Sequence, residues 1–99
     1  MPERQPMSEA MYYILLALLH PVHGYGVMQR VRELSGGRLV LGPGTLYTIL
    51  GKFVEERLIE ETAVEGRKRT YRLTGKGRAV FQEELDRLRA CLNDAEEEI

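Results

Sequence analysis

Six cationic residues lie within one short stretch of the sequence, and no acidic residue separates them. Guanidinium and ammonium groups at this density neutralise phosphate oxygens along a nucleic-acid backbone, or enter a narrow minor groove. The alternative interpretation is a solvated turn that serves solubility. The six residues are Arg67, Lys68, Arg69, Arg72, Lys76 and Arg78.

A second candidate surface is one side of the amphipathic segment between Pro43 and Arg57. At about 100° per residue, its apolar positions fall on one side of a helix and its small or polar positions on the other. Small and hydroxyl side chains let a helix approach base edges, and a lysine reaches a guanine or a phosphate. The apolar side consists of Leu46, Ile49, Leu50 and Phe53, and the other side of Gly44, Thr45, Thr48, Gly51 and Lys52, with Tyr47 at the flank.

Gly51 is informative because a glycine in the middle of a helix costs about 1 kcal/mol relative to alanine. Two explanations stay open from the residues alone. Either another helix packs closely against this position, or DNA approaches it closely.

The overall composition argues against several other classes of protein. The 99 residues are 43% hydrophobic and 29% charged, which is typical of one globular domain, and the net charge is −1. A single cysteine, Cys91, excludes an internal disulfide and is interpreted as a packing residue. No residues have the spacing of metal ligands, and neither His20 nor His23 has an evident catalytic partner, so we expect no metal, cofactor or enzymatic activity.

The apolar segment from Met11 to Leu19 is too short to cross a bilayer, which takes about 20 residues. No cleavage site of the secretory type follows it. The segment is therefore interpreted as a buried helix, and the protein is expected in the cytoplasm without a membrane partner.

The expected elements follow in the order helix, helix, helix, hairpin, helix. Ser8 and Thr74 should cap the first and last helices, and the hydrophobic period changes from 3.6 to 2 after the third helix, which predicts the hairpin. The first helix should end at His20-Pro21 and the second at Gly36-Gly37. The remaining expected ranges are a connector over 38–41 that can pair as a strand, a third helix over about 43–57, and strands over 58–65 and 69–74.

This order predicts a mainly α fold with a β-hairpin wing (α+β), which is a winged helix-turn-helix with a C-terminal dimerisation helix. Residues 1–74 would form the DNA-binding domain, with 1–7 as an N-terminal extension. Residues 75–99 would form the dimerisation helix and an acidic tail of the same compact unit.

In such a domain the third helix enters the major groove of double-stranded DNA, and the wing reaches the neighbouring backbone or minor groove. The predicted DNA contacts are Gly44, Thr45, Tyr47, Thr48, Lys52, Arg67, Lys68 and Arg69. The alternative is a winged-helix module that binds a protein and no DNA.

Apolar residues beyond the needs of one small core leave surfaces that could dock on another subunit. The last helix carries a narrow apolar seam with charges on both flanks, which is suited to docking on the helices of another subunit. The first helix has an apolar stripe that is wider than one core requires. The predicted interface residues are Met11, Tyr12, Leu15, Leu19, Phe81, Leu85, Leu88 and Leu92.

Four segments, "ILLALLHPVHGYGVMQRV", "GPGTLYTIL", "LIEE" and "RKRTYRLTGKGRAVF", resemble the PadR-like family of winged helix-turn-helix transcriptional repressors. The resemblance covers about residues 10–92. It implies a homodimeric repressor whose C-terminal helix packs on the N-terminal helix of its partner, bound to a near-palindromic promoter site. It also implies that Tyr25, at the start of the second helix, contacts the DNA backbone, and that the chain has a single dimerisation helix.

The sequence departs from the family pattern at four positions, which leaves the target sequence unpredictable. Pro43, Thr48, Gly51 and Arg57 stand where serine, proline, a larger residue and glycine are common. Some members of the family bind planar aromatic molecules between their subunits. Tyr12, Tyr13 and Phe81 could line such a pocket, but a dimer core is the favoured interpretation, so a small-molecule effector is not expected by default.

Overall fold

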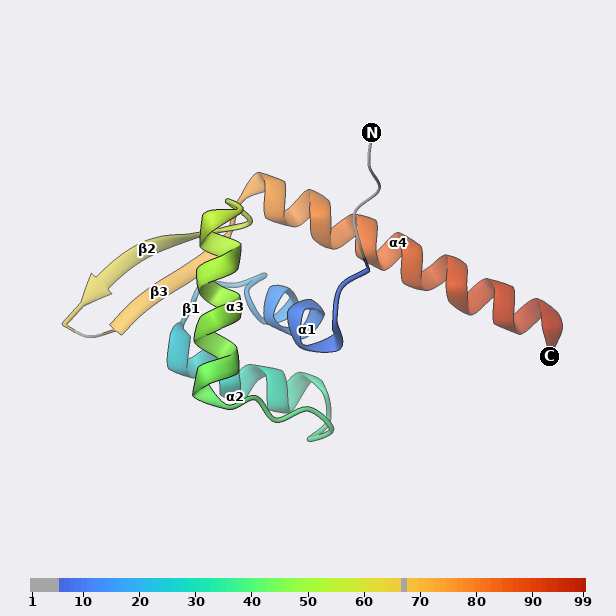
Figure 1. The fold of residues 1–99 in the computed structure, drawn as a ribbon, viewed down its shortest axis with the longest axis horizontal. Coiled ribbons are helices and arrows are strands. Elements are labelled where there is room, and N and C mark those ends of the chain that lie inside the picture. Colours follow the sequence, from blue (N-terminus) through green and yellow to red (C-terminus); the bar gives the residue numbers. More distant parts are fainter. Residues whose placement is uncertain (1–5, 67) are drawn as a thin grey trace.

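The structure is a computed structural model that describes residues 6–66 and 68–99. Arg67, one of the predicted DNA contacts, lies outside the described residues. The described residues form four helices and a three-stranded antiparallel sheet, which confirms the winged helix-turn-helix fold (Figure 1). In chain order the elements are α1 (Glu9–Ala17), β1 (Val22–His23), α2 (Gly24–Leu34), α3 (Pro43–Glu55), β2 (Ile59–Glu65), β3 (Lys68–Leu73) and α4 (Gly75–Glu98).

Three of the helices begin at a residue whose side chain accepts a hydrogen bond from a free amide of the first turn. The caps are Ser8, His23 and Thr74, whose acceptor atoms lie 3.1, 3.1 and 3.0 Å from the amide nitrogens of Met11, Gly26 and Gly77. α3 begins instead with Pro43, whose fixed φ suits the first turn of a helix. The two caps predicted from the sequence, Ser8 and Thr74, are confirmed.

Two expectations about the strands are corrected. Residues 38–41 form a loop, and the third strand of the sheet is β1, which the sequence analysis missed. β1 has two residues and pairs with β3, with Val22 opposite Tyr71 and His23 opposite Thr70. Because β1 leads directly into α2, this pairing places the start of α2 beside the wing.

The core lies between the first three helices and the inner face of the sheet. Phe53, Leu46 and Leu50 of α3 are buried there with Val27 and Val31 of α2. Leu15 also has no exposed surface and packs in the core of the single chain, which corrects its assignment to a dimer interface.

The other residues predicted at a dimer interface differ in how much surface they expose. Phe81 is only 6% exposed and stacks on Tyr12, with ring centres 5.4 Å apart. Leu88 and Leu92 are 39% and 57% exposed on the second half of α4, which extends beyond the other elements in Figure 1. Met11, Tyr12, Leu19 and Leu85 are half-buried.

Cys91 lies on the same second half of α4 and is exposed. Its interpretation as a packing residue is therefore wrong for the single chain.

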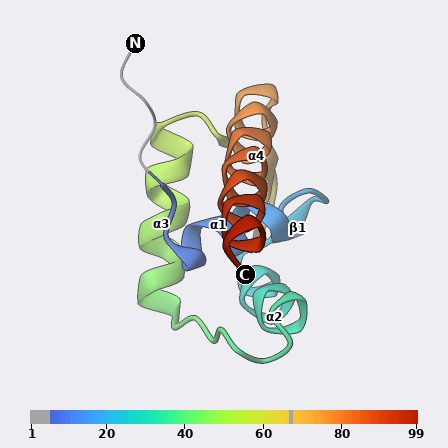
Figure 2. The ribbon, with the colours of Figure 1, turned by 90° about the vertical axis from the view of Figure 1, so that its right-hand side faces the viewer.

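Figure 2 looks along α4 from its C-terminal end, with α3 on one side of it and α2 below.

The first turn of α4 lies directly on the junction between α3 and β2. The amide of Thr74 donates to the carbonyl of Leu58 (3.0 Å), and the hydroxyl of Thr74 donates to the carbonyl of Arg57 (2.6 Å). A Cβ atom at Gly77 would overlap the carbonyl oxygen of Leu58. Gly77 is therefore required because any side chain would push α4 away from this junction.

α3 ends in a left-handed residue at the same junction. Arg57 has φ = 63°, the amide of Leu58 bonds to the carbonyl of Phe53 (2.9 Å), and the amide of Arg57 bonds to the carbonyl of Val54 (3.0 Å). This is the Schellman pattern, in which glycine is the usual left-handed residue. An L-residue adopts this conformation at a cost of about 1 kcal/mol, so the surrounding bonds hold Arg57 in place.

The close approach at Gly77 generates a prediction about stability. Gly77→Ala should lower the free energy of unfolding by about 2 kcal/mol or more, because the methyl group must displace backbone rather than a flexible side chain. Gly75→Ala, two residues earlier, is the matched control, since nothing lies within 4 Å of its Cβ position. Urea unfolding at a fixed protein concentration measures both variants, and equal effects would contradict the packing argument.

Candidate nucleic-acid interface

α3 presents its small-residue face to solvent. Its 13 residues span about 20 Å, and Figure 1 shows the helix crossing the molecule with the wing beside it. No other element covers the polar side of the helix within the described residues. The predicted contacts on it, Gly44, Thr45, Tyr47, Thr48 and Lys52, are all exposed, as is Gly51.

The structure excludes one of the two explanations for Gly51, namely close packing within the chain. Among the residues that the structure describes, no atom lies within 4 Å of the position where its Cβ would be. Close packing against another helix of the same chain therefore does not explain the glycine. The cost of about 1 kcal/mol has no compensation inside the chain.

A hollow of about 450 Å³ lies where the start of α2, the exposed side of α3 and the wing meet. It brings together four of the predicted contacts, which come from three different elements. Tyr25 of α2 is 70% exposed and Tyr47 of α3 is 50% exposed. The lining residues are His23, Gly24, Tyr25, Tyr47, Lys68, Arg69 and Tyr71.

Gly24 allows Tyr47 to reach this hollow. A Cβ atom at Gly24 would lie 3.1 Å from Cε1 and 3.2 Å from the hydroxyl oxygen of Tyr47, which is tighter than most side-chain contacts. The tyrosine ring therefore lies against the backbone at the start of α2. His23, Gly24 and Tyr71 were not predicted as site residues, although His23-Gly24-Tyr25 and Tyr71 belong to the segments that carry the family resemblance.

Two of the six cations form ion pairs with acidic residues of the neighbouring strand. The hairpin register places Glu60 opposite Arg72, and their side chains form an ion pair of 2.7 Å. Arg69 forms a longer ion pair of 3.7 Å with Glu61. The acidic residues of β2 thus pair with two of the six cations that the sequence concentrates after residue 66.

Two more of the six cations serve the packing of α4. The ammonium of Lys76 donates to the carbonyl of Glu56 (3.0 Å), and the guanidinium of Arg78 donates to the carbonyl of Leu19 (3.3 Å). Within the described part of the chain, Lys68 and Lys52 form no ion pair, and both are exposed. Lys68 is therefore the described cation of the wing that is left available to an external anion.

Tyr71 forms a buried wall of the hollow. Burial raises its pKa above the usual tyrosine value, and the nearby carboxylate of Glu61 raises it further, while the guanidinium of Arg69 opposes these effects. The phenol therefore stays neutral at physiological pH and retains a proton to donate.

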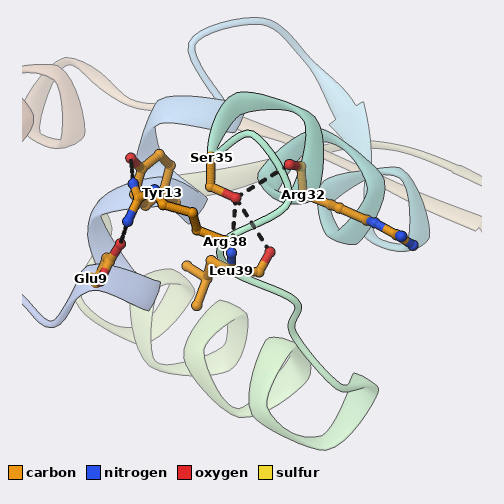
Figure 3. A network of polar contacts seen from close by, with 6 residues as sticks. All are labelled: Glu9, Tyr13, Arg32, Ser35, Arg38 and Leu39. Carbon is orange, nitrogen blue, oxygen red and sulfur yellow. Dashed lines mark hydrogen bonds and ion pairs between the residues drawn. The ribbon is translucent and has the colours of Figure 1, made fainter.

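The loop that leads into α3 is held by a network of polar contacts (Figure 3). The guanidinium of Arg38 donates to the carboxylate of Glu9 (3.0 Å) and to the hydroxyl of Tyr13 (2.8 Å), and both partners lie on α1. The hydroxyl of Ser35 accepts from the amide of Leu39 (3.0 Å) and lies 3.2 Å from the carbonyl oxygen of Arg32. These contacts fix the turn between α2 and α3, and with it the position of the exposed face of α3.

The described residues contain neither a metal cluster nor a membrane-spanning helix. Across 6–66 and 68–99, no cluster of histidine, cysteine and acidic side chains is placed to hold a metal ion. In the same part of the chain, no helix has the length and apolar character needed to cross a membrane.

Comparisons with known proteins identify relatives along most of the chain. The sequence profile of the transcriptional regulator PadR-like family matches residues 14–83. An uncharacterized 37.1 kDa protein in transposon TN4556 of Streptomyces fradiae is 35% identical over 78 residues, which cover 78% of this chain and 22% of that protein. The chain therefore spans about a fifth of the length of that curated relative.

The solved structures that are similar to this fold include the following three. A PadR-like transcription factor from Bacteroides fragilis has a TM-score of 0.72 at 29% identity, covering 90% of this chain and 87% of its own. Bacillus subtilis PadR in complex with operator DNA has a TM-score of 0.66 at 28% identity, covering 84% and 48%. RosR of H. salinarum has a TM-score of 0.68 at 25% identity, covering 89% and 76%.

The Arg38 network generates a prediction about coupling between α1 and the turn. Arg38→Ala and Tyr13→Phe should each lower the free energy of unfolding by less than about 1 kcal/mol, because Arg38 is largely exposed. Their combination should be less than additive, with a coupling of about 0.5 kcal/mol. A double-mutant cycle in urea at a fixed protein concentration measures the coupling. Additive losses would mean that the hydrogen bond does not hold the turn.

Proposed function

Because the chain belongs to the PadR-like family of transcriptional regulators, we propose that it binds double-stranded DNA in a sequence-specific manner as a homodimer. We further propose that it acts in the cytoplasm as a repressor, by occupying a near-palindromic promoter site. The observation that carries the proposal is the exposed, small-residue face of α3, which no element of the chain covers in the described residues. We assign it no enzymatic activity and no cofactor.

We propose that α3 enters the major groove with its small-residue face toward the bases. Threonine hydroxyl and methyl groups and the free ammonium of Lys52 supply groups that distinguish base pairs. The wing and the start of α2 then lie on the flanking backbone. The proposed contacts are Tyr25, Gly44, Thr45, Tyr47, Thr48, Lys52, Lys68 and Arg69.

The exposed seam of α4 supports the proposed homodimer. α4 has 24 residues and is about 36 Å long, and its second half presents Leu88 and Leu92 to solvent. We propose that this half packs on α1 of a second copy, beside the half-buried Met11, Tyr12, Leu19 and Leu85. A dimer of this kind would place two recognition helices about 34 Å apart, one turn of the duplex.

We propose no small-molecule effector. Tyr12 lies edge-on to Tyr13, with ring centres 5.2 Å apart, and stacks on Phe81, so the three rings pack on one another. This arrangement favours a structural role for these side chains in α1 and α4.

Selection from a random duplex library, followed by fluorescence anisotropy with the selected and a scrambled duplex, tests the proposal. We expect tight, saturable and salt-sensitive binding to the selected site, with two chains per site and a near-palindromic consensus. Equal, weak binding to both duplexes would contradict sequence-specific binding. Absence of binding at low salt would favour the alternative of a protein-binding module.

Gly51→Ala should separate stability from DNA binding. An alanine fits without a clash and should raise the free energy of unfolding by about 0.5–1 kcal/mol. The same methyl group should weaken binding to the selected site about tenfold if bases approach this position closely. Gly75→Ala is the control, since it also fills open space but lies outside the proposed interface. Unchanged DNA affinity in Gly51→Ala would show that no base comes near.

Lys52→Ala should distinguish base contact from phosphate contact. A lysine that bonds to a guanine contributes about 1–3 kcal/mol of discrimination. We therefore expect a loss of at least about fivefold more on the selected duplex than on the scrambled duplex, measured by anisotropy at one salt concentration. Equal losses on the two duplexes would contradict base recognition by Lys52.

A further inference from the structure

The hollow between α2, α3 and the wing combines tyrosine hydroxyl groups of the helices with cationic groups of the wing. We propose that it holds one phosphate of the DNA backbone, in contact with Tyr47 of α3 and Lys68 of β3 at once. This inference rests on the proposed function and deepens it, since it assigns a specific group of the DNA to a specific site.

The polar groups around the hollow are suited to an anion. Lys68 carries an unpaired positive charge, and the phenol of Tyr71 is neutral and can donate. No carboxylate is among the residues that line the hollow in the described part of the chain. The nearest acidic partner, Glu61, holds Arg69 at 3.7 Å, which is a long ion pair with which a phosphate can compete.

His23 adds a hydrogen-bond donor, and the atom that donates is its Nε2. Its Nδ1 atom accepts the hydrogen bond from the amide of Gly26 (3.1 Å), so in the neutral imidazole the proton lies on Nε2. The capping bond of α2 thus sets the tautomer, and the ring can only donate through its remaining nitrogen. His23 is one of the residues that line the hollow.

The rings of Tyr25 and Tyr47 make the hollow specific for a phosphate within a chain. Both are about half or more exposed, and both combine an apolar ring with a hydroxyl. The hydroxyl groups can donate to phosphate oxygens, while the rings offer contact to the adjoining sugars. A volume of about 450 Å³ accommodates a phosphate together with these sugars, which a free inorganic ion would leave unfilled.

Binding of a phosphate here would depend on the relative position of the wing and α3. Tyr47 lies directly against the backbone of α2 at Gly24, and the pairing of His23 with Thr70 holds the wing beside the start of α2. A single phosphate contact to Tyr47 and Lys68 therefore forms only when both elements lie on the same DNA backbone. It sets the register of α3 in the groove without reading a base.

Single neutral methylphosphonate substitutions, placed one at a time along the selected duplex, test the proposal. With the wild-type protein, we expect one position per half-site at which neutralisation weakens binding about five- to tenfold. Lys68→Ala should weaken binding to the unmodified duplex by a similar factor and lower the salt slope by about one. In the Lys68→Ala and Tyr47→Phe variants, neutralisation at that same position should cause a clearly smaller loss of DNA affinity.

Arg72→Ala is the matched control for Lys68→Ala. Arg72 is a cation of the same strand, but it pairs with Glu60 and does not line the hollow. It should retain the full effect of neutralisation at the identified position. Tyr47→Phe removes only the hydroxyl and leaves the ring against Gly24, so thermal unfolding should show it folded.

The outcomes separate the proposal from the function on which it rests. In one outcome the wild type binds tightly, and each methylphosphonate substitution weakens binding by the same factor in the wild type, in Lys68→Ala and in Tyr47→Phe. That result would overturn the phosphate site and leave DNA binding intact. A wild type that selects no DNA site would overturn the proposed function. Inorganic phosphate, titrated at constant ionic strength, should cause no saturable change in tyrosine resonances; saturable binding would assign the hollow to a free anion instead of DNA.

Discussion

The contact between the backbone of Gly77 and the carbonyl of Leu58 determines how the functional parts of this chain are arranged. At this point the end of α3, the start of β2, the end of β3 and the start of α4 meet within a few residues. The proposed recognition helix α3, the wing and the helix proposed to form the dimer therefore share one rigid joint. Arg57 remains in a left-handed conformation at this joint because bonds to Thr74 and to the last turn of α3 oppose its relaxation.

Contacts along α3 and its preceding loop leave the recognition helix little freedom to change its orientation. Arg38 ties the preceding loop to α1, Gly24 receives the ring of Tyr47 in the middle, and the Schellman motif closes the C-terminal end. A helix held in this way loses little conformational entropy when it enters a groove.

Local patterns in the sequence predict the elements well and the charges poorly. Caps such as Ser8 and Thr74, and the apolar period of Leu46, Leu50 and Phe53, are local, so they determine the helices and the fold class. β1 escaped prediction because two residues have no period. The ion pairs of the wing were not predicted because pairing with β2 depends on register, which brings Glu60 and Glu61 to cations that lie 8 or more residues away in the sequence. The lining of the hollow likewise depends on three separate segments.

The internal ion pairs of the wing have a consequence for the chain inside a cell. Affinity for arbitrary DNA grows with the number of phosphates that free cations neutralise, and a genome offers about a million or more competing positions. A regulator with a fully basic wing would be sequestered on bulk chromosomal DNA. By pairing Arg69 and Arg72 with its own glutamates, this chain leaves fewer free cations on its wing, which lowers the affinity expected for arbitrary DNA.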